Sequence, residues 1–169
     1  MRKLLLAGLC GLASLSDAFA AEPAKTPVLP ASPPLPYGVS LDLASARKCV
    51  HAVQASAAAN QWLMVVAVVD AGGHLVLAER MDNAQFGSVE PALQKAQTAV
   101  AFRRPTRLFD ETLAQGGAAL RLLKLPGALP IEGGLPLTRD GRIVGAVGVS
   151  GASAQQDGIA AQACVDALK

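Results

Sequence analysis

The chain has 169 residues, of which 51% are hydrophobic and only 17% are charged. Its 15 basic and 13 acidic residues give a formal net charge of +2, and no basic cluster occurs. This charge pattern predicts neither a nucleic-acid partner nor attachment to an acidic membrane surface.

The first 20 residues have the organisation of a secretory signal peptide. Arg2 and Lys3 form a basic start, an apolar run extends from Leu4 to Leu15, and Ala18-Phe19-Ala20 is a small-residue cleavage site. The run is too short for a permanent membrane span. We therefore expect cleavage near Ala20 and export to the periplasm or the extracellular space. Removing two basic residues and one acidic residue with the signal leaves 15 − 2 = 13 against 13 − 1 = 12, a net charge of +1.

Residues 21–40 hold six of the eleven prolines and show no hydrophobic periodicity. Such a segment cannot bury one face, so it is predicted to be an extended Pro-rich linker. Residues 41–169 then form one domain, which is long enough to bury a substantial core.

The first half of this domain predicts a helix followed by a hairpin. Apolar residues recur at helical spacing from Ala46 to Ala57 and indicate a helix over residues 41–59, which Ser40 or Asp42 can cap. Residues 62–70 and 74–81 read as two strands, joined by a turn at Asp70-Ala-Gly-Gly73. The first of them is almost continuously apolar, which is typical of a strand that is covered on both faces.

The second half predicts helix, short helix, strands and helix. A helix is expected over residues 89–103 and a shorter one, capped by Thr106, over 106–114, with Pro105 between them. A short strand is expected near 129–132, a hairpin over 133–151 with its turn at Asp140-Gly141, and a closing helix over 153–169. This order predicts an α+β domain, with an antiparallel sheet of about five strands flanked by helices.

The second arm of the 133–151 hairpin, residues 142–150, is nearly continuously apolar, so it is expected to be covered on both faces and central in its sheet. Gly145 and Gly148 interrupt this strand. Glycine weakens a strand interior, so two of them suggest that a ligand or another backbone comes close. Close packing of a helix on the sheet explains them equally well, and both interpretations stay open at this point.

Cys49 and Cys164 are the two cysteines outside the signal, and both fall in predicted helices. They either form one bridge across the domain or remain two buried thiols, since connectivity cannot be read from a sequence. A bridge that closes so long a loop would contribute about 4–5 kcal/mol in the chain-entropy model. No Cys-x-x-Cys motif for covalent haem attachment or a zinc ribbon occurs.

The sequence lacks a Gly-x-Ser-x-Gly nucleophile motif and has only two histidines, His51 and His74, without partners at metal-ligand spacing. A candidate site arises instead where Lys95 and Thr98 on one helix line meet the Arg103–Thr106 corner and the Gly-rich hairpin. Cationic side chains beside Gly-rich backbone suit an acid or a propionate-bearing ligand. The alternative is that Arg103 and Arg104 form a solvated helix end that complements the helix dipole.

Three blocks of motifs follow one another along the domain. They are Val68-Val-Asp-Ala-Gly-Gly73-His-Leu-Val with Arg80-Met-Asp-Asn-Ala, then Lys95-Ala-Gln-Thr-Ala with Phe102-Arg-Arg-Pro-Thr106, and finally Gly133-Gly-Leu-Pro136, Asp140-Gly141, Gly145-Ala-Val-Gly-Val-Ser-Gly151 and Gln156-Asp157. Together they resemble the GlcG/HbpS family of haem-binding proteins, which is related to the C-terminal domain of PduO-type corrinoid adenosyltransferases. The resemblance runs from Leu41 to the C-terminus.

This resemblance implies a profilin-like or roadblock-like domain that assembles into homo-oligomers, commonly octamers. It implies a ligand pocket formed by Lys95, Thr98, Arg104, Thr106, Gly133, Gly134 and Ser150. Exported members of the family bind haem, so it also implies non-covalent haem b, with His51 on the first helix as the axial ligand. His74 is expected to be an exposed turn histidine.

Two functions remain open. The first is an exported haem-binding module without turnover, which stores, senses or relays haem. The second is a pocket enzyme or accessory factor for a small hydroxy or keto acid such as glycolate, with Lys95 or Arg104 holding the carboxylate. The low aromatic content, 4%, counts modestly against a tight haem slot.

Overall fold

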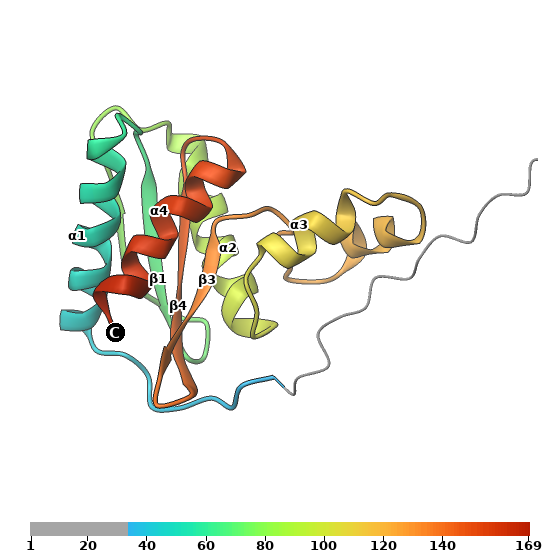
Figure 1. The fold of residues 1–169 in the computed structure, drawn as a ribbon, viewed down its shortest axis with the longest axis horizontal. Coiled ribbons are helices and arrows are strands. Elements are labelled where there is room, and N and C mark those ends of the chain that lie inside the picture. The colour runs from blue at the N-terminus through green and yellow to red at the C-terminus, as the bar shows by residue number, and fades with distance from the viewer. Residues whose placement is uncertain (1–33) are drawn as a thin grey trace, which may run out of the picture.

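A computed structural model of the protein describes residues 34–169 (Figure 1). The predicted signal peptide and the first part of the predicted linker lie outside these residues.

The described residues build one four-stranded sheet. Its strands are β1 (Val65–Asp70), β2 (Leu75–Arg80), β3 (Gly134–Arg139) and β4 (Arg142–Ser150). They are ordered β2-β1-β4-β3, and each neighbouring pair is antiparallel. The two central strands, β1 and β4, are the almost continuously apolar ones, and nearly all their residues are buried. The sequence pattern therefore predicted correctly which strands are covered on both faces.

Helices cover both faces of this sheet (Figure 1). Helices α1 (Leu43–Ala59) and α4 (Ala154–Ala167) pack on one face, over a core that includes Val66, Val68, Val147 and Val149. Helix α2 (Val89–Ala101) packs on the other face against core residues of the opposite strand parity. Asp42 caps α1 by accepting a 2.8 Å hydrogen bond from the Ser45 amide, as one of the two predicted alternatives has it.

Three short helices complete the described part of the chain. The 3-10 helix η1 (Phe86–Ser88) leads into α2, whereas α3 (Arg107–Leu113) and the 3-10 helix η2 (Gly117–Lys124) form an arm to one side of the sheet (Figure 1). No residue of η2 is buried, and Leu120 and Leu123 are exposed on it.

The prediction of about five strands was wrong, because residues 129–132 form no strand. Their backbone donors are used elsewhere: the Leu129 amide donates to the Thr98 hydroxyl at 2.8 Å, and the Glu132 amide donates to the Asp110 carboxylate at 3.0 Å. A segment whose amides bond to side chains cannot add a ladder to the sheet. The α+β class is confirmed, and the profilin-like or roadblock-like assignment stays a prediction.

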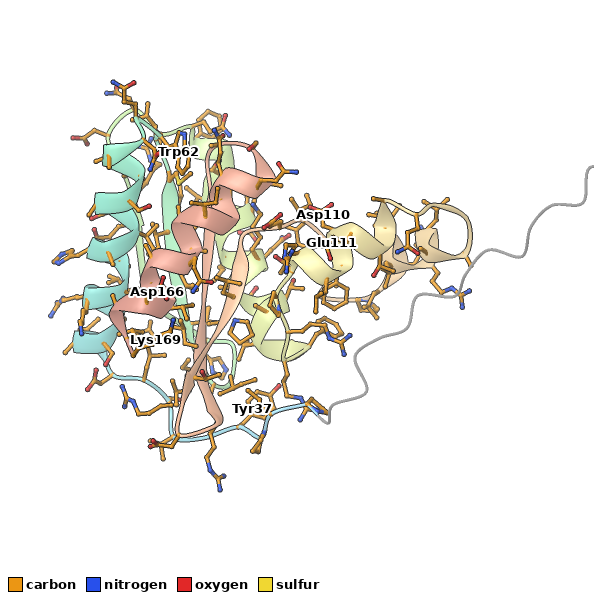
Figure 2. The ribbon with its side chains drawn as sticks, in the orientation of Figure 1. Tyr37, Trp62, Asp110, Glu111, Asp166 and Lys169 are labelled. Carbon is orange, nitrogen blue, oxygen red and sulfur yellow. A yellow bond between two sulfur atoms is a disulfide. The ribbon has the colours of Figure 1, made fainter. Side chains whose placement is uncertain are left out.

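The end of the predicted linker is hydrogen-bonded to the domain. The Ile143 amide donates to the Pro36 carbonyl and the Gly38 amide donates to the Ile143 carbonyl, at 2.9 and 2.8 Å. The Tyr37 hydroxyl donates to the Val100 carbonyl near the end of α2, at 2.9 Å. Figure 2 shows Tyr37 beside this corner of the molecule. Residues 36–38 thus run along β4 rather than standing free of the domain.

A disulfide joins α1 to α4 on one face of the sheet. It links Cys49 and Cys164, which are 115 residues apart and both fully buried. The sequence left open whether the two cysteines form a bridge or remain separate thiols, and the structure has the bridge. It fixes the first and last helices of the domain to one another.

Candidate functional site

Four of the predicted site residues meet where β3 begins: Lys95, Thr106, Gly133 and Gly134. The Gly134 amide donates to the Thr106 hydroxyl at 2.9 Å, and the Thr106 amide donates to the Gly134 carbonyl at 3.0 Å. Thr106 was predicted to cap α3, but its side chain makes no capping bond there. Its hydroxyl instead fixes the start of β3.

Glycine is required at this junction because α2 lies directly against the sheet. A Cβ on Gly134 would collide with the Lys95 carbonyl oxygen, and one on Gly148 would collide with the Ala92 carbonyl oxygen. Gly133 has φ 126°, and a Cβ there would lie 2.7 Å from the Val149 carbonyl oxygen and 2.9 Å from the Lys95 Nζ. At Gly148, the close neighbour that the sequence suggested is therefore the α2 backbone.

The Lys95 side chain is held in a buried ion pair. Its Nζ lies 2.7 Å from Asp157 Oδ2 and donates to the Val149 carbonyl at 3.1 Å, and the residue is 2% exposed. Burial raises the pKa of the Asp157 carboxyl, an effect that the Lys95 ammonium opposes. The positive charge of the Lys95 ammonium is thus balanced by the Asp157 carboxylate of the same chain.

Asp157 is the residue of this cluster that sequence reasoning did not assign. It lies in the first turn of α4, and its second carboxylate oxygen accepts a 3.1 Å bond from the Ala152 amide. The Gln156-Asp157 pair was part of the family resemblance. However, only the packing of α4 against the end of β4 reveals Asp157 as the partner of Lys95.

Thr98 and Ser150 complete the buried part of the predicted set. The Thr98 hydroxyl donates to the Gln94 carbonyl at 2.7 Å and accepts from the Leu129 amide, so it fixes the segment that follows η2. Ser150 is 8% exposed at the end of β4, opposite Val65. Both side chains lie within the packed interior.

Arg103 and Arg104 form a corner rich in aromatic contacts at the end of α2. The Arg104 guanidinium carbon lies 5.5 Å from the Phe109 ring centroid, and its Nε donates to the Phe102 carbonyl at 3.1 Å. The Arg103 guanidinium carbon lies 5.5 Å from the Tyr37 ring centroid. Both arginines are half-buried. Sequence reasoning found the two cations but missed Tyr37 and Phe109, which come close only through the fold.

The two histidines lie apart from these residues. His51 is exposed on α1, whereas Lys95 lies on α2, which covers the opposite face of the sheet. The His74 side chain is 83% exposed beside Asp70, in agreement with its prediction as an exposed turn histidine. The structure therefore does not bring His51 together with the rest of the predicted set.

A cavity between β3, β4 and the end of α4 is too small for haem. Its volume is about 50 Å³, and it is lined by Leu41, Leu137, Thr138, Arg139, Val144, Val165, Leu168 and Lys169. Pockets for ligands of drug size or larger measure about 300–1,000 Å³. The donor chemistry for haem is nevertheless present, because the His51 imidazole is open to solvent. A porphyrin that uses this donor must therefore lie on the surface of the chain.

Two further properties hold for residues 34–169. None of their helices is both long and apolar enough to cross a membrane. No group of three or more histidine, cysteine, aspartate or glutamate side chains among them is arranged to hold a metal ion.

Comparison with known proteins supplies the family. A family model described as "Haem degrading protein HbpS-like" matches residues 41–166. Protein GlcG of Escherichia coli strain K12 is 38% identical over 112 residues, which cover 66% of this chain and 81% of GlcG.

Solved structures agree with this match. A double mutant of Streptomyces reticuli HbpS superposes with a TM-score of 0.72 at 35% identity, covering 87% of this chain and 99% of that one. The crystal structure of a PduOC:haem complex superposes with a TM-score of 0.70 at 32% identity, covering 78% of this chain and 96% of that one. The chain belongs to the HbpS-like family, as its motifs indicated.

Proposed function

We propose that this domain binds haem, with the His51 imidazole as the axial ligand. The observation that carries the proposal is the likeness of the fold to the PduOC:haem complex, together with membership of the HbpS-like family. His51 supports it because its side chain is exposed on α1 and makes no hydrogen bond or ion pair with another residue in the described part of the chain. A bound haem would supply a coordinated iron centre; the protein supplies the imidazole and the surrounding surface.

The binding is proposed to be non-covalent, to haem b. Cys49 and Cys164 are consumed in a disulfide, so neither thiol is available for attachment. The role we propose is storage, sensing or relay of haem without turnover.

Export to the periplasm or the extracellular space is part of the same proposal. The signal-like leader motivates it, and the buried disulfide supports it, because such bonds persist in oxidising compartments. Assembly into a homo-oligomer, commonly an octamer in the family resembled, is also proposed. The 86% exposed Phe86 in η1 and the 44% exposed Val89 at the start of α2 support an apolar contact between copies.

The alternative function, on a small hydroxy or keto acid, needs Lys95 or Arg104 to hold a carboxylate. Because the Lys95 ammonium is bound by Asp157, that function would depend on Arg104. Haem binding is the better supported proposal.

A haemin titration of the mature protein, followed in the Soret band, tests the proposal. We expect a saturable shift at one haem per chain that His51→Ala removes, because the variant lacks the axial nitrogen. His74→Ala is the matched control, since it removes the other exposed histidine. The absence of a shift in the wild-type protein would contradict haem binding. A bound Soret band that decays under a reductant would contradict binding without turnover.

A further inference from the structure

The outer face of α1 carries a compact group of cationic and metal-binding side chains. Cys49, Val50 and Val53 point into the core, so Arg47, Lys48 and His51 fall on the opposite side of the helix and are exposed. Neither Arg47 nor Lys48 has a hydrogen bond or ion pair with another described side chain. Both cations therefore stand free within one helical turn of the only histidine on this helix.

The spacing of these three residues suits a porphyrin. A haem held by His51 would need cations close to that imidazole to neutralise its propionates. Arg47 and Lys48 lie four and three residues before His51, which is about 4.5–6 Å along the axis. Helical side chains lean toward the N-terminus of the helix, so all three side chains lean the same way and keep this spacing at the helix surface.

The other cations predicted for a propionate lie elsewhere. Lys95 is 2% exposed and bound to Asp157, on the far face of the sheet from His51. Arg104 is stacked on Phe109 at the end of α2. Neither position is compatible with a ring coordinated by His51 of the same chain.

We infer that Arg47 and Lys48 bind the haem propionates, so that the haem site is the outer face of α1 and is separate from the Lys95–Gly134 cluster. This inference rests on the proposed function and adds to it the residues that neutralise the ligand. On this inference, Lys95, Thr106 and Gly134 have a structural role, which is to hold α2 and β3 together.

The test compares two ligands on two proteins. Haemin and its dimethyl ester differ only in the charge of the propionates, so their affinity ratio reports that charge. We expect the wild-type protein to prefer haemin by about tenfold at low salt, which is the effect of two exposed charge pairs. In Arg47→Glu/Lys48→Glu the preference for haemin is expected to be lost or reversed, because the new carboxylates repel the propionates, while the Soret shift due to His51 persists with the ester.

The matched control is Arg121→Glu/Lys124→Glu, which makes the same change in charge on the exposed helix η2. It should keep the wild-type preference for haemin. If the Arg47/Lys48 variant also keeps it, or if Arg104→Ala alone abolishes it, the inference is overturned while haem binding stands. If wild-type protein shows no Soret shift with either ligand, the proposed function itself fails.

Discussion

At the scale of single residues, the ion pair between Lys95 and Asp157 is the most consequential contact. Both side chains are 3% exposed, and the ammonium passes Gly133 to reach across the end of the sheet. Removing one partner of a buried pair leaves an uncompensated charge in the interior, which costs far more than a surface pair is worth. The pair therefore ties α2 to α4 from opposite faces of the sheet.

We predict that Lys95→Met lowers the free energy of unfolding by about 3–5 kcal/mol, because the Asp157 carboxylate then remains buried without its cation. Urea unfolding at neutral pH measures this loss. The double variant Lys95→Met/Asp157→Leu should recover much of it, since neither charge remains.

The exposed pair Arg107–Glu111 provides the control. Its atoms are 3.0 Å apart, but the side chains are 57% and 55% exposed. Arg107→Ala should cost at most about 1 kcal/mol. If Lys95→Met and Arg107→Ala lowered the free energy of unfolding equally, the buried ion pair would stabilise the fold no more than the exposed one.

Sequence reasoning grouped Lys95, Thr106, Gly133 and Gly134 correctly in space but did not find what joins them. The pattern of cations beside glycines resembles a binding site for an anion. Within the chain, however, the ammonium meets a carboxylate from a helix 62 residues further on. Pairing between residues so far apart in the sequence depends on tertiary packing, which cannot be predicted from a local sequence pattern.

At the scale of elements, the almost continuous apolar residues of β1 and β4 predicted that both strands are covered on both faces, and for β4 also its central place in the sheet. The tight turn at Asp140-Gly141 was also predicted from the sequence. Both residues have the positive φ that such a hairpin turn requires, 50° at Asp140 and 69° at Gly141. The segment near residues 129–132 was misread because its short apolar run resembles a strand. Its amides are bound by the Thr98 and Asp110 side chains, and these bonds could not be predicted from spacing.

The disulfide between α1 and α4 gives a prediction at this scale. Cys49→Ala/Cys164→Ala should lower the free energy of unfolding by about 2–5 kcal/mol, because the unfolded chain loses a cross-link that closes a long loop. Thermal unfolding with and without dithiothreitol measures the same effect. The double variant should be insensitive to the reductant, and a wild-type melting temperature unaffected by full reduction would contradict a stabilising bridge.

At the scale of the whole molecule, the sheet separates two helical layers. Helices α1 and α4 cover one face, with His51 exposed on α1, whereas α2 packs tightly on the other face (Figure 1). The haem proposal and the inference about Arg47 and Lys48 both depend on which of these layers the ligand contacts.

The most direct measurement is a map of haemin contacts by two-dimensional amide NMR of the mature protein. The paramagnetic iron broadens the signals of nearby amides, so it reports position without any substitution. We predict broadening along the exposed face of α1 around His51, with the amides of Thr98, Thr106 and Gly134 unaffected. Broadening centred on Thr106 and Gly134, with α1 unchanged, would contradict the account.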